Sequence, residues 1–420
     1  MGLNMEKRRP RFLLLFFVPA LIFLTCGPAA AQLVLGQYED EAPLRTWNTF
    51  GIPSAPSIGL GGTQFARASD SSISLVNPAL LVSLPRYSVT LTGAWAWASM
   101  FKYSLVNTGA VASAGNLTAG FFGVEFGGFS LRAGEWAFSA SAGILENYGR
   151  PGVALEDPSL TYSLDLSQDG YLRDYHFAAA RRITTTLSAG LGITYVTGRR
   201  RRNISEIYAY STGQVTITDD KSESESGVFL NGGIAWEPTG RLTAALVFRS
   251  PYIKRADAQS ALRYLAPAGD TDIRIDASAR NEYRQPWIFG AGGCYRFSDA
   301  WTAAADLAYF GWSRYSAVFF GEPLNRHFRD VLRVGAGVEY AAAVTLLGRP
   351  GRVPLRLGLS YDPQPTAVPR SAYLSVSVGA GLQVSSIVID LAGIVGRESG
   401  SGNSLTAGKV VLTFTYVFDR

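Results

Sequence analysis

The stretch "IGLGGTQFARASDSSISLVNPALL", residues 58–81, places glycines and hydroxyl side chains between two apolar patches, which is the composition of a phosphate-binding loop. A dinucleotide-binding loop needs a third glycine three residues after the second, between a strand and a helix. Gln64 stands at that position, and no P-loop lysine follows. The spacing therefore disfavours a nucleotide site, and we expect no cofactor.

Histidine chemistry is limited, because His176 and His327 are the only histidines. An outer-membrane lipase needs a serine, a histidine and an orienting group, which His176 in "DYHF" is available to join. A surface or aromatic-girdle position is the default for this residue. Two histidines also cannot build a metal site of several imidazoles, so the sequence favours a protein that is neither an enzyme nor a metal binder.

Isolated charged residues interrupt segments that are otherwise rich in glycine, alanine and serine. They are Arg249, Arg296, Asp306, Arg333, Glu339, Arg356 and Asp390. One interpretation makes an arginine the anchor of a ligand carboxylate, through a charge-assisted hydrogen bond. The candidate ligand-binding residues are then Arg249, Asp306, Arg333 and Arg356. The other interpretation, which we favour for any single residue, is an internal network of salt bridges.

A run of four arginines, Arg199, Arg200, Arg201 and Arg202, is expected at the outer end of a strand. Guanidinium groups match the geometry of phosphate, so this run is a candidate contact for lipopolysaccharide. A solvated group of loop charges is an equally good interpretation.

The N-terminus reads as an export signal. Basic residues precede the apolar run "FLLLFFVPALIFL", and "CGPAAAQ" supplies a small-residue cleavage site, so residues 1–31 are expected to be a signal peptide removed after Ala31. A lipoprotein signal at Cys26 is the alternative. Cys294 is then the single remaining cysteine, which excludes an intramolecular disulfide. Nucleic acid is not an expected partner of an exported chain whose net charge is only +5.

The rest of the chain alternates with period two, as strands with two different faces do. Leu355, Leu357 and Leu359, for example, alternate with charged or small residues, and several apolar faces end in aromatic residues. Eight residues of a tilted strand span roughly 20 Å of membrane, which suits aromatic girdles around an apolar band. About fourteen segments carry the pattern, near residues 87–99, 115–127, 135–147, 172–183, 185–199, 226–237, 241–250, 285–297, 301–315, 329–342, 353–362, 372–384, 386–396 and 407–418.

The connections between these segments alternate between short turns and longer polar stretches such as 200–225 and 251–284. Short periplasmic turns and long external loops are typical of outer-membrane barrels, and an even strand number closes such a barrel. The predicted fold is therefore all-β, a transmembrane antiparallel barrel in the outer membrane of a Gram-negative-type bacterium.

Several strings resemble FadL-type outer-membrane transporters of long-chain fatty acids and other hydrophobic compounds. They are "WEPTGRLTAALVFRSPY", "PWIFGAGGCYRFSDAWTAAADLAYFGWSRY", "FRDVLRVGAGVEY" and "PLRLGLSYDPQPT", and the stretch that ends in Asn77-Pro78-Ala79 is similar to the N-terminal hatch of that family. The resemblance implies a fourteen-stranded barrel at 87–420 with a hatch at 32–86 plugging its lumen.

The resemblance also implies a mechanism of passive, hatch-gated diffusion. A hydrophobic molecule such as a long-chain fatty acid is caught by external loops, enters the barrel, and leaves through a gap in the wall made by a kinked strand. Strand 115–127 is the candidate for this gap, because Phe121 and Phe122 are adjacent and Gly123, Gly127 and Gly128 follow; an ordinary bulge is the alternative. The candidate hatch and gating residues are Gly59, Gly61, Gly62, Asp70, Asn77, Pro78 and Ala79.

Other features depart from this pattern or leave alternatives open. The connections near 148–170 and at 111–114 are short for a capture groove, and Asp419 and Arg420 follow the terminal aromatic of the assembly signal. The expected partners are the hydrophobic ligand, outer-membrane lipid including lipopolysaccharide, and the barrel assembly machinery, with the chain as a monomer. The alternative function is a non-transporting relative that serves as a scaffold or shuttle for protein secretion; a water-filled porin fits less well, because the hatch obstructs flow.

Overall fold

The structure is a computed structural model that describes residues 54–100, 117–157, 162–211, 213–266, 272–324, 327–346, 348–368, 370–400 and 406–418. The expected signal peptide at 1–31, the first part of the expected hatch, the connection at 111–114 and the last two residues lie outside these ranges. Within the described ranges, no helix is long and apolar enough to cross a membrane.

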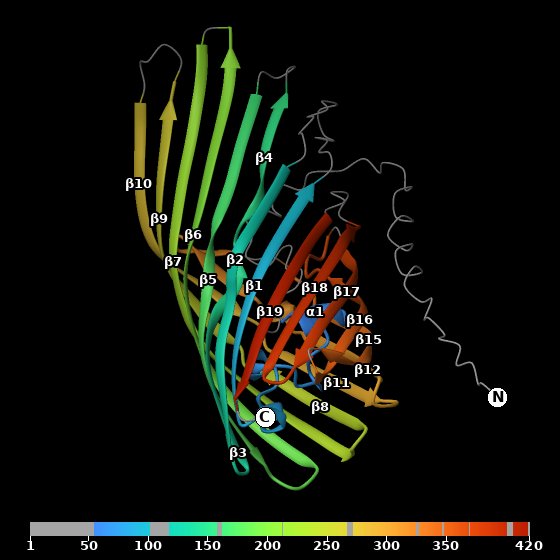
Figure 1. Ribbon diagram of the computed structural model, residues 1–420. Coiled ribbons are helices and arrows are strands. Elements are labelled where there is room, and N and C mark those ends of the chain that lie inside the picture. The colour runs from blue at the N-terminus through green and yellow to red at the C-terminus, as the bar shows by residue number, and fades with distance from the viewer. Residues whose placement is uncertain are drawn as a thin grey trace, which may run out of the picture.

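Fourteen antiparallel strands close into a ring (Figure 1). They are β1 Tyr87–Met100, β2 Leu117–Ala133, β3 Trp136–Asn147, β5 Tyr162–Arg182, β6 Leu187–Tyr210, β7 Gly213–Thr239, β8 Leu242–Arg249, β11 Ile288–Arg296, β12 Trp301–Phe310, β15 Val331–Leu346, β16 Arg349–Pro363, β17 Ala372–Val384, β18 Ile387–Ser399 and β19 Thr406–Phe418. The first and last strands close the ring, with Tyr87 opposite Phe418. The predicted barrel and its strand number are confirmed.

The alternation of side chains separates a lipid face from an inner face. On β16, Leu355, Leu357 and Leu359 are about half exposed, whereas Arg356 and Ser360 are buried inside the ring. Large apolar side chains that point outward are stable only where the surroundings are hydrocarbon. The sequence pattern of this strand therefore indicates an outer face that contacts lipid rather than a face that packs in a protein core.

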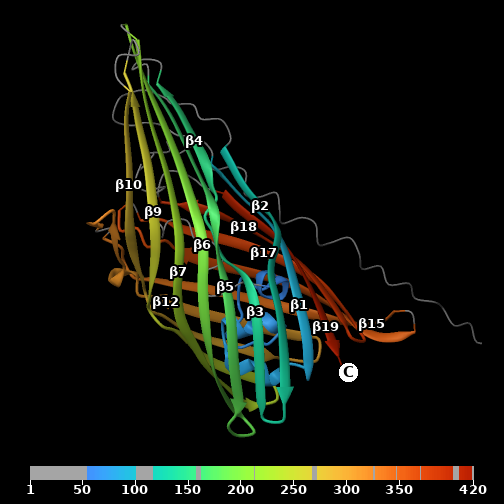
Figure 2. The same cartoon turned by 90° about the vertical axis from the view of Figure 1, so that its left-hand side faces the viewer.

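One side of the barrel continues far beyond the ring as an open sheet. The outer parts of β5, β6 and β7 are joined there by β4 Arg150–Asp157, β9 Tyr252–Leu265 and β10 Asp272–Gln285. These strands rise above the rest of the barrel in Figure 1, and Figure 2 shows the same sheet from its outer side. We call this sheet the extension.

The extension corrects three predictions. Residues 200–225 and 251–284 are not polar loops, because these segments pair strand to strand outside the membrane. Residues 148–170, expected to be short for a capture groove, contain part of a β-hairpin, which leaves that expectation standing. Residues 199–202 lie within β6 rather than at its end. In water both faces of a strand can be polar, so charged residues do not prevent the pairing.

A shorter external connection joins β12 to β15. It contains a 3₁₀ turn, η5 Trp312–Arg314, and the small strands β13 Ser316–Phe319 and β14 Glu322–Leu324. Asp330 anchors this connection by accepting hydrogen bonds from the Tyr309 hydroxyl, at 2.5 Å, and the Ser313 N–H, at 2.7 Å. Partial burial raises the pKa of Asp330, but these hydrogen bonds outweigh burial, so the net pKa lies below its usual value.

The N-terminal segment lies inside the ring and plugs it, as predicted. It forms α1 Ala55–Gly59, η2 Ser71–Leu75 and η3 Pro78–Ser83, drawn in blue within the barrel in Figure 1. Helix α1 packs against β16 to β19, and η3 packs against β5, β6 and β7. We call residues 54–86 the plug.

Candidate functional site

The plug turns sharply at Gly61 and Gly62, which have positive φ values of 73° and 76°. Glycine is the residue that adopts this region without steric cost. A Cβ on Gly61 would also collide with the carbonyl oxygens of Leu359 and Ala336, and one on Gly62 would collide with the guanidinium of Arg333. These two predicted hatch residues therefore lie where the plug meets the wall, and Gly59 packs beside Arg356.

The predicted residues Asp70 and Asn77 cap the two short plug helices. The Asp70 carboxylate accepts from the Ser72 N–H at 2.9 Å, and the Asn77 side-chain oxygen accepts from the Ala79 N–H at 3.1 Å. The Asn77 amide also donates to the carbonyl of Phe65 at 2.7 Å. Because Pro78 lacks an N–H and fixes φ, it suits the first position of η3. These residues hold the internal shape of the plug.

Asp306 on β12 clamps the plug to the wall. One oxygen of its buried carboxylate accepts hydrogen bonds from the N–H groups of Gln64, at 2.6 Å, and Phe65, at 2.9 Å. Both donors are in the segment that immediately follows the glycine turn. Asp306 therefore contacts the plug, which agrees with an internal structural role.

Wall glycines make room for the plug backbone on several sides of the barrel. A Cβ at any of these positions would collide with a plug atom: Gly190, Gly233, Gly290, Gly337 and Gly358. On Gly190, for example, it would lie 2.6 Å from the backbone nitrogen of Ala79. The small residues on the inner faces of the strands therefore accommodate a tightly packed plug.

Wall hydroxyl groups satisfy further plug donors. The N–H of Ala55 donates to Thr413 at 2.9 Å, and the N–H of Gly61 donates to Ser377 at 3.0 Å. Ser71 contacts hydroxyls on β1 and β2, and one of these, that of Thr90, contacts Thr415 on β19. The sequence does not single out these serines and threonines, because such residues are common on any polar face.

A chain of ion pairs runs along the inner wall beside the plug. Arg356 contacts Glu339 at 2.6 Å and Asp390 at 2.5 Å, and Arg67 of the plug contacts Glu339 at 2.6 Å. The guanidinium of Arg356 is thus occupied by two carboxylates. This arrangement favours the salt-bridge interpretation of Arg356 over the ligand-anchor interpretation.

The other charged candidates take different positions. Arg249 is buried, with its guanidinium 5.2 Å from the centroid of the Phe229 ring. Arg333 is buried beside Gly62. Arg296, the last residue of β11, is exposed at the end of the strand and donates a hydrogen bond to the carbonyl of Gly240.

An apolar cluster fills the lumen between the plug and the external connection. Its buried members are Phe65, Leu75, Val76, Phe126, Val247, Ile288, Ala308, Phe310, Trp312 and Val331, with Tyr315 and Phe328 packed against them. Three of these residues belong to the plug, and Trp312 belongs to η5. We call this set the lumen cluster. It joins the outer mouth to the plug by apolar contacts.

The wall next to the lumen cluster is interrupted between β2 and β3. Their pairing ends at Phe126 opposite Gly143; beyond it, β2 residues 117–124 pair with β1, and Ile144, Glu146 and Asn147 of β3 pair with β5. Glu125 is skipped in the register with β1, so Glu125 and Phe126 both point inward, as a β-bulge requires. The predicted irregularity in this strand is thus a bulge at Glu125, and the outward side chain of Phe122 is 88% exposed.

The bulge is held by an ion pair across the lumen side of β1. Lys409 on β19 contacts the carboxylate of Glu125 at 2.6 Å, and both side chains are buried. A buried carboxylate needs such a partner. The ion pair therefore accounts for the presence of an acid in this wall.

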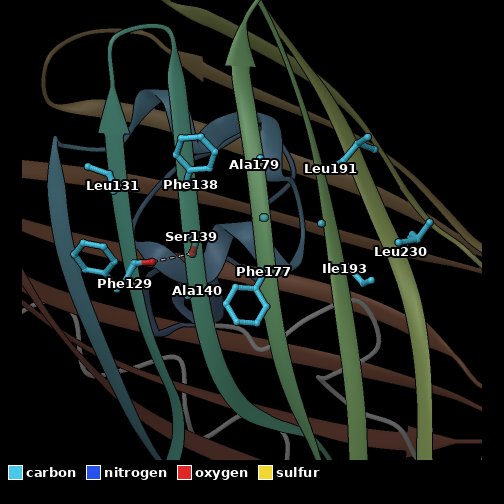
Figure 3. Close-up of a pocket in the computed structure, with 12 residues that line it drawn as sticks. Phe129, Leu131, Phe138, Ser139, Ala140, Phe177, Ala179, Leu191, Ile193 and Leu230 are labelled. Carbon is cyan, nitrogen blue, oxygen red and sulfur yellow. Dashed lines mark hydrogen bonds between the residues drawn. The ribbon is translucent and has the colours of Figure 1, made fainter.

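An apolar hollow of about 590 Å³ lies on the outer face of the wall, over β2, β3, β5, β6 and β7 (Figure 3). Phe129, Phe138 and Phe177 border it, and small residues such as Ala140 form its floor. Ser139, whose hydroxyl donates to the Phe129 carbonyl at 3.0 Å, also lies 3.3 Å from the Ser74 hydroxyl of the plug. The wall is therefore thin where the plug meets the hollow.

His176 is buried in the lumen, so its expected surface or girdle position is wrong. Its Nδ1 lies 2.9 Å from the Thr194 hydroxyl. His327 is exposed in the external connection. Across the described ranges, no group of three or more histidine, cysteine or acidic residues is arranged to hold a metal ion.

The four arginines at 199–202 separate into two faces of β6. Arg199 and Arg201 are exposed on the outside, and Arg202 is half-buried on the inner side. Arg200 is buried among Glu223, Glu225 and Tyr283, with Lys254 nearby on Glu225 at 3.1 Å. This buried group of alternating charges stabilises the base of the extension.

Comparison with known proteins identifies the family. The family model described as "Outer membrane protein transport protein (OMPP1/FadL/TodX)" matches residues 54–394. No curated protein sequence matches the chain.

Solved structures share the fold at low identity. The toluene transporter TbuX of Ralstonia pickettii is 17% identical, with 89% of this chain and 100% of that chain covered and a TM-score of 0.61. A FadL homologue of Pseudomonas aeruginosa is 15% identical, with 88% and 100% covered and a TM-score of 0.60. The toluene transporter TodX of Pseudomonas putida is 14% identical, with 88% and 99% covered and a TM-score of 0.63.

The family match covers most of the chain and agrees with the closed barrel, its plug and its apolar lumen. The protein is a non-enzymatic outer-membrane channel of the kind found in Gram-negative bacteria. The chain belongs to the OMPP1/FadL/TodX family of outer-membrane transport proteins.

Proposed function

We propose that this protein takes up hydrophobic molecules by passive diffusion that is gated by movement of the plug. The lumen cluster carries this proposal, because it offers an apolar route from Trp312 near the mouth to Phe65 in the plug. A route of this kind favours molecules that lose little hydration when they leave water.

Long-chain fatty acids and aromatic hydrocarbons are the two ligand classes to be separated. A fatty acid requires a partner for its carboxylate, and Arg356 is already occupied by Glu339 and Asp390. Toluene, which the names of two structural relatives mention, requires no such partner. The occupied arginine therefore favours uncharged ligands beside Arg356, and fatty acids, for which Arg249 and Arg333 are the other candidate partners, are the competing class.

The exit that the structure supports best is lateral. The interrupted wall between β2 and β3 adjoins Phe126, a member of the lumen cluster. A molecule that reaches Phe126 would pass between residues 117–125 and 144–147 into the outer leaflet of the membrane, after the plug residues beside it have moved. The downward path stays blocked by the plug.

Uptake by a Gram-negative host that lacks its own transporter of this family tests the proposal. Labelled toluene, hexadecanol and hexadecanoate are supplied with and without the protein; the two sixteen-carbon compounds differ only in the carboxylate. We expect several-fold faster uptake of toluene and hexadecanol when the protein is present, and a smaller gain for hexadecanoate.

Two variants test the route itself. Phe126→Ser removes a ring from the lumen cluster, and Phe122→Ser removes an outward ring from the same strand as a matched control. The first is expected to change uptake and the second to leave it unchanged. Equal uptake of all three compounds with and without the protein would show that it is not a transporter.

A further inference from the structure

Three arginines gather on the outward face of β5 and β6, on the external side of the barrel. Arg173, Arg199 and Arg201 are all exposed. Arg173 lies opposite Thr197 and Tyr171 lies opposite Arg199, which makes Arg173 and Arg199 diagonal neighbours, about 7 to 8 Å apart. Arg201 follows Arg199 on the same face by one strand period. We call these three residues the arginine cluster.

The arginine cluster lies just outside the apolar band of the membrane. Tyr175 and Tyr195 are partners across β5 and β6, with ring centroids 6.5 Å apart and both side chains nearly half exposed. Outward tyrosines at the end of an apolar band mark the lipid interface. Arg173 is the next outward residue of β5 beyond Tyr175, so the cluster is level with lipid headgroups.

The arginine cluster lacks the acidic partners that most other arginines on this face have. Four of the five outward arginines on β9 and β10 form an ion pair: Arg255 with Glu282, Arg263 with Asp272, Arg274 with Asp276 and Arg280 with Asp257, whereas Arg284 forms none with the described residues. Within the described part of the chain, the arginine cluster forms no such pair. Asp169 lies opposite Arg201 in the register, yet no ion pair joins them.

The neighbouring strand leaves space and adds hydroxyl groups. On β7, Ser224 lies opposite Arg199 and Ser222 lies opposite Arg201. The short serine side chains beside the long arginine side chains leave a shallow depression, which hydroxyl and guanidinium hydrogen-bond donors surround. An anion that fits forked guanidinium groups and accepts several hydrogen bonds is a phosphate.

We propose that the arginine cluster binds the phosphate groups of lipopolysaccharide in the outer leaflet. The position of the cluster at headgroup level, its unneutralised charge and its forked donors together match a glycolipid that carries phosphates at the same depth. Bound lipid would hold the base of the extension against the membrane surface.

Lipid binding to the purified full chain in detergent micelles tests the proposal. The probe is lipid A with two phosphates, titrated while native mass spectrometry measures the bound fraction. The variant is R173S/R199S/R201S. Its matched control, R263S/R274S/R280S, removes three arginines from the same face and changes the net charge equally, but removes arginines that already have acidic partners.

We expect the affinity for lipid A to fall about tenfold or more in R173S/R199S/R201S and less than twofold in the control, because the control arginines are already neutralised. Dephosphorylated lipid A should bind both variants and the unaltered protein alike. Equal losses in both triple variants would overturn the proposal, since they would show a general effect of charge. Phosphatidylglycerol binding with the same dependence on the cluster would overturn the assignment to lipopolysaccharide.

Heat-modifiable migration on gels confirms that each variant has folded, and all six substitutions are at exposed positions. A variant that keeps its folded migration and also keeps full affinity for lipid A would refute the site directly.

Discussion

The carboxylate of Asp306, on the barrel wall, accepts a hydrogen bond of 2.6 Å from the backbone N–H of Gln64, in the plug. The same oxygen accepts the next N–H along the chain, that of Phe65. A single wall residue therefore fixes the plug immediately after its glycine turn. Loss of this acceptor leaves two buried donors without a partner, which costs about 1–3 kcal/mol for each donor.

Asp306→Ala is expected to loosen this part of the plug. The amides of Gln64 and Phe65 should exchange hydrogen with solvent at least tenfold faster, as measured by hydrogen-exchange mass spectrometry, because a loss of 1.4 kcal/mol is a tenfold change. Asp299→Ala, in an exposed turn, is the control. Unchanged exchange in Asp306→Ala would mean that the clamp does not hold the plug.

A disulfide between plug and wall is expected to stop transport. The hydroxyls of Ser74 and Ser139 lie 3.3 Å apart, so S74C/S139C in a Cys294→Ala background should cross-link η2 to β3. Uptake should fall at least tenfold when the pair is oxidised and recover with reductant. S88C/S130C, whose parent hydroxyls lie 2.6 Å apart, links two wall strands and is the control. Normal uptake by the oxidised plug-to-wall variant would contradict gating by η2.

Removal of the bulge in β2 is expected to close the lateral exit. Deletion of Glu125 together with Lys409→Met restores simple alternation and leaves no unpaired ammonium. E125M/K409M keeps the bulged residue count and serves as the control. Uptake should fall several-fold in the variant that lacks Glu125 and carries Lys409→Met, but not in the control. If both variants transport equally, the interruption between β2 and β3 is not the exit.

Alanine at Gly61 is expected to destabilise the protein more than alanine at Gly134. Both glycines have positive φ, 73° and 60°, so each substitution costs about 1–2 kcal/mol of backbone strain. A Cβ at Gly134 meets nothing within 4 Å, whereas one at Gly61 collides with two wall carbonyls, which adds about 1–3 kcal/mol. The temperature at which the folded gel band disappears should fall further for G61A; the opposite order would refute the close contact.

Loss of Lys254 is expected to open the base of the extension. Its ammonium lies 3.1 Å from Glu225, and both side chains are almost fully buried. Lys254→Met leaves a buried carboxylate poorly compensated, at a cost of about 3–5 kcal/mol. Arg280→Met breaks an exposed pair and should cost less than about 1 kcal/mol. Limited proteolysis of the extension compares Lys254→Met with Arg280→Met. E225Q/K254M should regain part of the stability that Lys254→Met loses.

The membrane strands were predictable because the hydrocarbon of the bilayer requires apolar side chains on one face of each strand. Leu355, Leu357 and Leu359 face lipid, so they must be apolar, and the residues between them face a plug that tolerates small or charged groups. The extension lies in water, where this rule does not apply. Arg199 to Arg202 therefore resembled a loop, and only pairing with β7 places them in a strand.

Individual residues of the candidate site could be predicted from the sequence, but the contacts between them could not. Asp306 and Gly61 stand out in the sequence, yet their contacts join segments separated by more than 200 residues. The bulge left a signal as well, since Glu125 and Phe126 interrupt the alternation. The adjacent Phe121 and Phe122 indicate the right strand but the wrong residues, because an apolar pair stands out more in the sequence than an acid beside a phenylalanine.

The hydrogen bonds of the plug have a thermodynamic consequence. Ala55, Gly61, Gln64 and Phe65 give their N–H groups to wall residues, and the N–H of Gly61 is shared with the carbonyl of Ile58 in the plug. Peptide 54–86, separated from the barrel, would therefore keep its internal caps at Asp70 and Asn77 but lose the wall acceptors of these four donors. Movement of the plug in the proposed function would therefore require local unfolding at these four donors, and its rate should rise steeply with temperature, as unfolding rates do.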